Sequence, residues 1–330
     1  MVAGQGMTDY PAQKHRTGSR LRKSSGRKFS GIIAVFIFAV LLFVILGGFL
    51  KTVVPSRVST TGGWNGQTSL AIAVNSDPPA IVIYAKEASK LGVFSLQQDL
   101  KYATGNANDP IKPVNSLFLG PGAKTEAVLS NLGGVNVSKF VYFKNPPKLE
   151  KDQVYEMFKQ FASLKTPISI VFTKSDFSSD LSKMELLRLW WEIKGLTLSQ
   201  IDFKNVNNFA EEIIGAGGKK FNGIDRESIN HEMIKYFDSS VRGDIEIVNN
   251  SGEAGAGLLA TYMLGAYGWN VVNVSLSQNV EPQCRIMDSD GGRDVELLAG
   301  IFGCNIIREQ NASFGNPVIM LGSNFAKRYF

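Results

Sequence analysis

The stretch from Glu246 to Val274, EIVNNSGEAGAGLLATYMLGAYGWNVVNV, decides the fold. It begins with an alternating β-friendly run and breaks at a polar turn made of Asn249, Asn250, Ser251 and Gly252. A glycine-punctuated helical segment and a second apolar run follow. A strand, a tight turn, a helix and a second strand in this order predict a βαβ-type unit, so the fold class is α/β.

Glycine-rich turns between a strand and a helix can bind phosphate. Here the glycines fall at Gly252, Gly255 and Gly257, which matches neither G-x-G-x-x-G nor the P-loop pattern, and no lysine or arginine follows in the helix. Glu253 already places a negative charge at the positive end of the helix dipole. Anion binding and close packing of the helix on its sheet are the alternatives. The small residues favour packing, so we interpret the turn as a structural signature.

The excess positive charge of the chain is confined to its N-terminus. The 330 residues carry a formal net charge of +6. Residues 1–29 contain one acidic side chain, Asp9, and the basic residues Lys14, Arg16, Arg20, Arg22, Lys23, Arg27 and Lys28. The rest of the chain holds equal numbers of basic and acidic side chains. Because a folded part without net positive charge lacks the electrostatic footprint of nucleic-acid binding, we exclude nucleic acid as a partner.

An apolar segment follows the basic tail. Residues 30–50, SGIIAVFIFAVLLFVILGGFL, contain no charge, and 21 residues at ~1.5 Å each span the ~30 Å core of a bilayer. The positive-inside rule places residues 1–29 in the cytoplasm and residues 51–330 outside it. A cleaved signal peptide is the alternative, but its apolar core would be shorter, and the following KTVVPSR offers no small-residue cleavage site. We predict a single-pass protein of the cell membrane with an extracytoplasmic C-terminus.

Cysteine and histidine are too few for the usual catalytic and metal-binding patterns. Cys284 and Cys304 lie on the predicted outer side, where a disulfide could persist, and both a bridge and two buried thiols remain open. His231 is the single histidine after the tail. The outer part therefore has no zinc-type ligand cluster and no Ser-His-Asp or Cys-His set. We expect no cofactor and no metal.

The pattern of apolar runs and breaks divides the chain. Most runs alternate as strands or repeat with helical spacing, including an expected strand at 168–173 and an expected helix at 208–214. Asp180 is the expected cap of a helix that reaches Lys194. The predicted parts are a basic tail (1–29), a transmembrane helix (30–50), a stalk (51–68), an α/β domain (69–215), a connector (216–241) and a small C-terminal βαβ-type α/β domain (242–330).

Three motifs in the last part occur in a familiar order. They are DIEIVNNSGEAGAGLLATYMLGAYGWNVVNV, VELLAGIFGCNII and PVIMLGSNF. Together they resemble the C-terminal (LytR_C-type) domain of the LytR-CpsA-Psr family over about residues 242–330. Asn250 stands where that family usually has a turn glycine, and Asn324 where it usually has aspartate.

The upstream part resembles the catalytic domain of the same family in a degenerate form, over about residues 69–215. SLAIAVNSD matches the family's Gly-x-Asp region and leaves Asp77. FSLQQDL matches its Ser-Ile-Pro-Arg-Asp motif with Asp99 kept, but Gln97 and Gln98 replace proline and arginine. LSNLGGVNVSKFVYF and IKYFDSS suit a later helix-to-strand segment and the family's connector.

The resemblance implies a transferase of phosphoglycan from a polyprenyl-pyrophosphate carrier, with arginines on the pyrophosphate and aspartates on Mg²⁺. Arginine suits that task because its planar guanidinium binds phosphate oxygens in bidentate fashion. This chain has no arginine between Arg57 and Arg188. Asp77 and Asp99 are therefore vestigial candidates for catalysis or magnesium binding, and four lysines (Lys86, Lys90, Lys101 and Lys112) are the remaining nearby cations.

Two functions follow from these features. The first is a non-catalytic cell-envelope protein that binds wall glycan or a protein partner, or acts as a scaffold. The second is a divergent phosphoglycan transferase that uses lysines with Asp77 and Asp99, and only this alternative would require magnesium. The deficit of arginine favours the first function.

Overall fold

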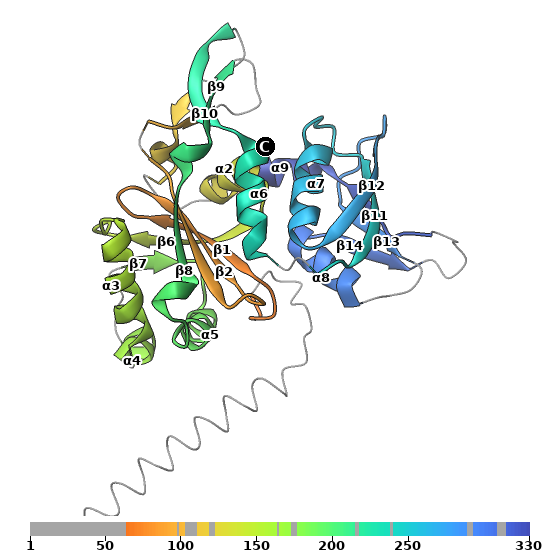
Figure 1. Cartoon of the computed structure of the whole chain (residues 1–330). Coiled ribbons are helices and arrows are strands. Elements are labelled where there is room, and N and C mark those ends of the chain that lie inside the picture. Colours follow the sequence, from red (N-terminus) through yellow and green to blue (C-terminus); the bar gives the residue numbers. More distant parts are fainter. Residues whose placement is uncertain are drawn as a thin grey trace, which may run out of the picture. The chain divides into compact units, whose positions relative to one another are not determined.

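The computed structural model describes residues 64–97, 99–102, 111–118, 123–163, 165–172, 177–214, 218–237, 240–288, 293–308 and 315–330. Within this part the protein is a mixed α/β structure built on two main sheets (Figure 1). Residues 58–330 form one compact unit. The predicted basic tail, the transmembrane helix at 30–50 and most of the stalk lie outside the described residues. Among the helices that are described, none has the length and apolar character needed to cross a bilayer.

The first sheet has six strands. In order across the sheet they are β7 (Phe177–Ser179), β6 (Val137–Phe143), β1 (Leu70–Asn75), β2 (Ala80–Ala85), β3 (Lys90–Ser95) and β8 (Ile201–Asn205). Strand β2 is antiparallel to both β1 and β3, whereas β6 is parallel to β1 and β8 is parallel to β3. Strands β1, β3, β6 and β8 therefore run in the same direction, and their carboxyl ends share one edge of the sheet.

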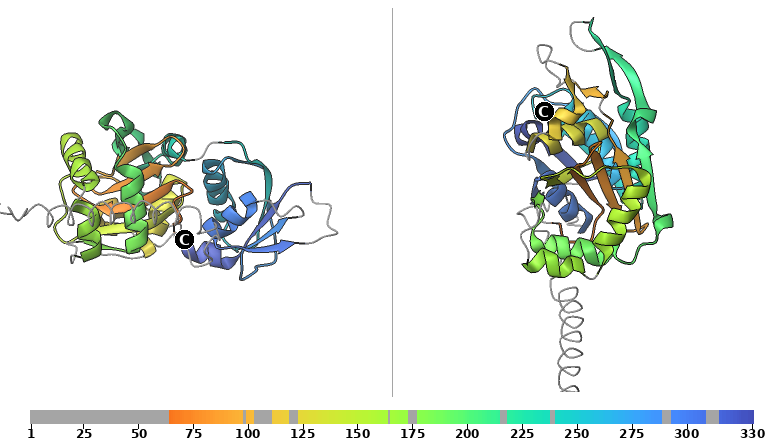
Figure 2. Two further views of the ribbon diagram at one scale, coloured as in Figure 1. Left: turned by 90° about the horizontal axis from the view of Figure 1, so that it is seen from below. Right: turned by 90° about the vertical axis from the view of Figure 1, so that its left-hand side faces the viewer.

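Alternating side chains of these strands enter two different cores. Leu70 and Ile72 of β1 pack with α3 (Lys151–Ala162) and α5 (Lys183–Ile193). Ala71 and Ala73 instead pack with α2 (Ala123–Gly133) and α6 (Arg226–Met233). Because strand side chains alternate between faces, the sheet is covered by helices on both sides (Figure 2). Its strands are apolar on both faces for that reason.

The second sheet has five strands in the order β12 (Trp269–Leu276), β11 (Gly243–Asn249), β15 (Val318–Leu321), β13 (Arg285–Asp288) and β14 (Asn305–Arg308). Its helices are α7 (Ala256–Ala266), α8 (Arg293–Phe302) and α9 (Ser323–Tyr329). Strand β11 is parallel to both neighbours, and α7 connects it to β12. The quoted stretch thus forms the βαβ unit predicted from its sequence.

Core packing continues from the first sheet into the second. Buried residues on α2 and α6 belong to the same apolar cluster as Ile247 and Met263. The Tyr329 hydroxyl donates to Asn136 Oδ1 at 3.0 Å, and the Phe237 and Tyr267 rings lie 5.4 Å apart. The first contact fixes the C-terminal helix α9 against the segment between α2 and β6, and the second joins the residue that follows α7 to the segment that follows α6.

The two cysteines are joined. Cys284 and Cys304 form a disulfide with a Cα–Cα distance of 4.5 Å. It links the start of β13 to the segment between α8 and β14, beside strands that pair in register. Of the two possibilities that the sequence left open, the structure has the bridge.

Three expected local features differ in the structure. Residues 165–172 form helix α4 (Lys165–Phe172) where a strand was expected from residue 168. Residues 210–214 form β9 (Ala210–Ile214), which pairs with β10 (Lys220–Ile224), where a helix was expected. The cap of α5 is Ser182, because Ser182 and Glu185 form a reciprocal capping box. The remaining short elements are β4 (Lys101–Tyr102), β5 (Lys112–Pro113) and the 3₁₀ turns at Val114–Phe118, Leu198–Gln200, Val206–Phe209 and Ile234–Tyr236.

Candidate functional site

The candidate residues Asp77 and Asp99 lie at the same edge of the first sheet. Asp77 follows β1 and Asp99 follows β3, and both strands end at the edge where the carboxyl ends of β6 and β8 also lie. In open α/β sheets, ligands bind outside the carboxyl ends of the strands. The topology therefore brings both predicted residues to the edge where a site is expected.

Asp77 is held through its backbone. Its N–H donates to the Pro147 carbonyl at 2.9 Å, and its carbonyl accepts from the Leu149 N–H at 2.7 Å. This bridge pairs Asp77 with Lys148 in the segment between β6 and α3. The Asp77–Pro78 peptide bond is cis. The side chain of Asp77 is exposed beside that segment.

The carboxylate of Asp99 has a different set of partners. Its Oδ1 accepts from Asn207 Nδ2 at 2.9 Å, and its Oδ2 accepts from Asn222 Nδ2 at 3.3 Å. Asn207 also donates to Gln97 Oε1 at 2.7 Å. Asp99 is therefore held by neutral amides from the 3₁₀ turn after β8 and from β10.

Asp77 and Asp99 are held by separate parts of the chain. Mg²⁺ requires octahedral oxygen coordination with one or two carboxylates as direct ligands. Both carboxylate oxygens of Asp99 already accept amide hydrogens, and Asp77 is held by the separate 147–149 segment. Within the described ranges, no group of three His, Cys, Asp or Glu side chains is placed to hold a metal ion.

A surface groove lies beside the Asp77 bridge. It has a volume of about 320 Å³ and is open to solvent. One wall is the 147–148 segment and the other is a face of α3; the lining residues are Pro147, Lys148, Asp152, Gln153, Glu156, Met157 and Gln160. Amide and carboxylate groups on the α3 wall and the Lys148 ammonium on the other wall offer both donors and acceptors to a ligand rich in hydroxyl groups. Sequence reasoning missed this groove, because nothing in the helical pattern of 151–162 distinguishes a solvated face from a binding face.

The arginines near the first sheet are engaged elsewhere. Arg188 donates from Nη1 to the Trp64 carbonyl at 2.9 Å, and Arg226 donates to Asn131 Oδ1. Neither lines the groove. Among the lining residues the one cation is Lys148, a point charge without the bidentate geometry of a guanidinium.

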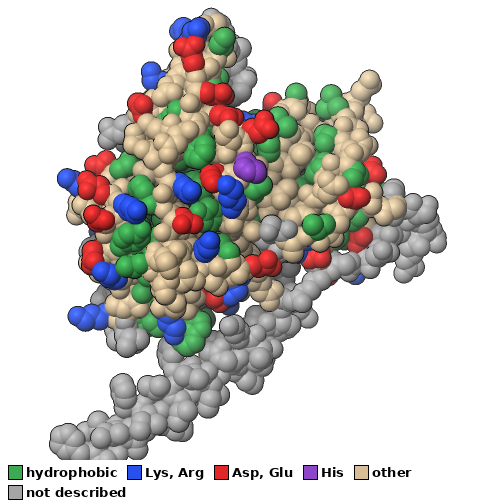
Figure 3. All heavy atoms as spheres, viewed as in Figure 1, with side chains coloured by type: hydrophobic (Ala, Val, Ile, Leu, Met, Phe, Trp, Pro, Cys, Tyr) green, Lys and Arg blue, Asp and Glu red, His purple; other side chains and the backbone are tan. Residues whose placement is uncertain are grey.

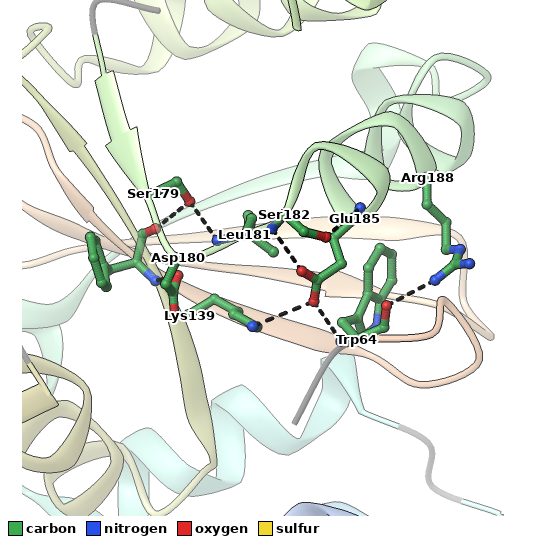
Figure 4. Close-up of polar contacts among 9 residues, drawn as sticks. Trp64, Lys139, Ser179, Asp180, Leu181, Ser182, Glu185 and Arg188 are labelled. Atoms are coloured by element: carbon green, nitrogen blue, oxygen red, sulfur yellow. Dashed lines mark hydrogen bonds and ion pairs between the residues drawn. The ribbon is translucent and has the colours of Figure 1, made fainter. Parts of the chain in front are cut away.

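A buried ionic network ties β6 to α5 (Figure 4). The Lys139 ammonium lies 3.4 Å from Glu185 Oε1, and these side chains are 10% and 8% exposed. Glu185 also accepts from the Trp64 N–H at 2.6 Å and from the Ser182 N–H at 2.7 Å. Burial alone would raise the pKa of Glu185, but these hydrogen bonds and the Lys139 charge lower it overall. Both carboxylate oxygens of Glu185 accept hydrogen bonds, so Glu185 has a structural role and anchors the backbone of Trp64 to α5.

Two carboxyl groups, those of Glu126 and Asp180, form a pair next to this network. Burial raises the pKa of Glu126 to about 8, and the negative charge of Asp180 adds to the shift. Glu126 hydrogen-bonds to Asp180, whose Oδ1 also accepts from the Phe140 N–H at 2.9 Å. The shared proton therefore resides on Glu126 at neutral pH. Sequence reasoning named Asp180 only as a helix cap and missed its pairing with Glu126, since the two residues lie on distant segments.

In the turn at residues 249–252, the side chains of Asn249 and Ser251 hydrogen-bond locally. Asn249 Oδ1 accepts from the Ser251 N–H and hydroxyl, and Asn249 Nδ2 donates to the Glu253 carbonyl. Asn249, Asn250 and Ser251 are buried, and Gly252 has a φ of +82°. A Cβ at Gly257 would lie 3.0 Å from Val274 Cγ1, which shows how closely α7 lies on β12. These contacts leave little room for a phosphate group.

Comparison with known proteins gives matches to solved structures alone. No family model matches the chain, and no curated protein matches it. Bacillus subtilis TagV is similar over 51% of this chain and 96% of its own, at 10% identity and a TM-score of 0.39. Bacillus subtilis TagT is similar over 52% of this chain and 91% of its own, at 11% identity and a TM-score of 0.35. The Lin1025 protein of Listeria innocua is similar over 52% of this chain and 98% of its own, at 10% identity and a TM-score of 0.37.

Proposed function

We propose that this chain is a non-catalytic cell-envelope protein, anchored by residues 30–50, whose extracytoplasmic part binds wall glycan in the groove over α3. The sequence supports the anchor and its orientation through the basic tail, the uncharged 21-residue segment and the neutral remainder. The motifs in residues 242–330 support a relationship to the LytR-CpsA-Psr family.

One observation carries the proposal. The edge of the first sheet retains a groove with hydroxyl-binding side chains, while none of its lining residues is an arginine. Transfer of a phosphoglycan develops dense negative charge, which needs preorganised cations or a metal ion. A neutral sugar needs hydrogen bonds instead, and Gln153 and Gln160 supply amide donors and acceptors. The groove therefore suits recognition of sugar hydroxyls better than phosphoryl transfer.

Co-sedimentation of the detergent-purified full chain with purified wall glycan tests the binding. We expect the double variant Gln153→Ala/Gln160→Ala to bind about tenfold more weakly or worse, because loss of two hydrogen bonds worth ~1 kcal/mol each lowers affinity by that order. Both side chains are exposed, so the fold should tolerate the change.

Gln278→Ala is the matched control, since Gln278 is an exposed glutamine outside the groove, in the segment after β12. It should bind glycan as the unmodified chain does. Equal binding by the double variant would remove the groove from the proposal, and no binding by the unmodified chain would remove glycan as the ligand.

A further inference from the structure

The second sheet ends in an open strand. Strand β12 is outermost in its sheet and pairs with β11. The Ser277 N–H donates to the Asn249 carbonyl at 3.1 Å, so residues 277 and 275 direct their backbone polar groups toward β11. Because the direction alternates along a strand, Val274 and Leu276 direct their N–H and C=O groups to the opposite edge. No strand of the described ranges pairs with that edge.

Exposed apolar side chains surround this edge. Val272, Val274 and Leu276 are 47%, 49% and 72% exposed. Leu258, Val280 and Phe330 are 53%, 61% and 44% exposed. Val280 lies beside Gly252, Phe330 beside Gly255, and Val274 beside Gly257, each within 3.3 Å of the place that a Cβ of that glycine would take. These three side chains therefore gather along the turn and the start of α7. Figure 3 shows hydrophobic side chains at the surface over α7 and β12. We call these six residues the β12 patch.

Charge distinguishes this edge from the other edges of the two main sheets. Residues 268–280, GWNVVNVSLSQNV, contain no charged side chain. By contrast, β8 carries Asp202 and Lys204, β14 ends at Arg308, and β7 has three residues. Natural edge strands are protected by charge, proline or short length, because an open edge templates pairing with another chain. Strand β12 has a register shift near Val271, and bulges of this kind can also protect an edge, but the shift leaves residues 273–276 regularly paired.

We propose that two copies of this chain associate through β12, antiparallel about a two-fold axis, to form one continuous ten-stranded sheet. Val274 of each copy lies opposite Leu276 of the other, and each pair exchanges two backbone hydrogen bonds. A second copy fits this edge because an uncharged strand meets itself without like-charge repulsion. The same contact covers the β12 patch on both copies, as an isologous interface requires. This proposal does not depend on the glycan groove.

The register predicts a specific cross-link. Ser275 lies opposite Ser275 of the second copy as a non-hydrogen-bonded pair, with Cα atoms about 4.5 Å apart, which permits a disulfide. Mild oxidation of the detergent-purified full chain carrying Ser275→Cys should give a covalent dimer on a non-reducing gel. Ser178→Cys is the control, because Ser178 is also an exposed serine on an edge strand, in β7. It should remain monomeric on the gel.

Light scattering of the full chain then tests the edge itself. We expect Leu276→Lys to raise the dimer dissociation constant about tenfold or more, since each lysine would lie opposite the apolar Val274 of the other copy and the two ammonium groups would lie diagonally across the axis. The Leu276 side chain is 72% exposed, so the melting temperature should change little. Val241→Lys is the control at an 87% exposed valine outside the β12 patch, and it should associate normally. A chain that stays monomeric at all concentrations, or a Ser275→Cys variant that links no better than Ser178→Cys, would overturn the proposal.

Discussion

Glu185→Ala is expected to lower the free energy of unfolding by about 3–5 kcal/mol, the range for breaking a buried ion pair. The substitution leaves the Lys139 ammonium with a side chain 10% exposed and no counter-charge from α5. It also removes the acceptor of the Trp64 N–H and half of the capping box of α5. Urea unfolding of the full chain in detergent, followed by circular dichroism, measures the loss.

Glu212→Ala is the matched control for this prediction. Glu212 also pairs with a lysine, Lys220 at 2.6 Å, but both side chains are more than 60% exposed. An exposed pair contributes ~0–1 kcal/mol, so this variant should unfold almost as the unmodified chain does. If Glu185→Ala is no more destabilising than Glu212→Ala, the network in Figure 4 is not the structural anchor described here.

We expect the chain to lose stability between pH 5 and pH 9 through the ionisation of Glu126, and we expect Glu126→Gln to remove most of that loss. Burial and Asp180 raise the pKa of Glu126 from 4.5 to about 8 in the folded state. The folded chain therefore keeps a proton that the unfolded chain releases above pH 4.5. This contribution to stability is fully present below pH 4.5 and is lost as pH rises through 8. The loss is on the order of 2 kcal/mol, because the full linkage value of ~5 kcal/mol is discounted for the partial exposure of Glu126.

Unfolding free energies measured at intervals across this range test the assignment. Glutamine keeps a hydrogen bond to Asp180 but cannot ionise, so its profile should be flatter and its stability at pH 9 higher than that of the unmodified chain. Glu227→Gln, at an exposed glutamate of α6, should keep the original slope. A Glu126→Gln variant with the same slope as the unmodified chain would show that Glu126 does not hold this proton.

Much of the fold follows from local patterns. The turn at 249–252 and the apolar runs on either side of α7 identify the βαβ unit, because each element carries its own periodicity. The segment 208–214 misled because Glu211 and Glu212 followed by two isoleucines lack the two-residue alternation of a strand and suit a helix better. Residues 210–214 form a strand because they pair with β10, and such pairing between separate segments cannot be predicted from a local sequence pattern. The same holds for 165–172, where packing of α4 on α5 decides the conformation.

Part of the candidate site could be predicted from the sequence. Asp77 and Asp99 were placed after β-like runs, and the parallel directions of β1 and β3 bring them to one edge. Their actual partners, the 147–149 segment and two asparagines, come from elsewhere in the chain. The Ser182–Glu185 spacing was a visible capping box that could have replaced Asp180 as the predicted cap. The Lys139–Glu185 contact had no such signal, because the residues are far apart in sequence.

The central claim is that the groove over α3, beside Asp77, recognises glycan and that the chain does not transfer it. The most direct measurement incubates the detergent-purified full chain with a labelled polyprenyl-pyrophosphate-linked glycan, Mg²⁺ and acceptor wall, and counts label on the wall. The account predicts no transfer above a protein-free control, with and without Mg²⁺. Transfer that the full chain catalyses and that Asp99→Ala abolishes would contradict it.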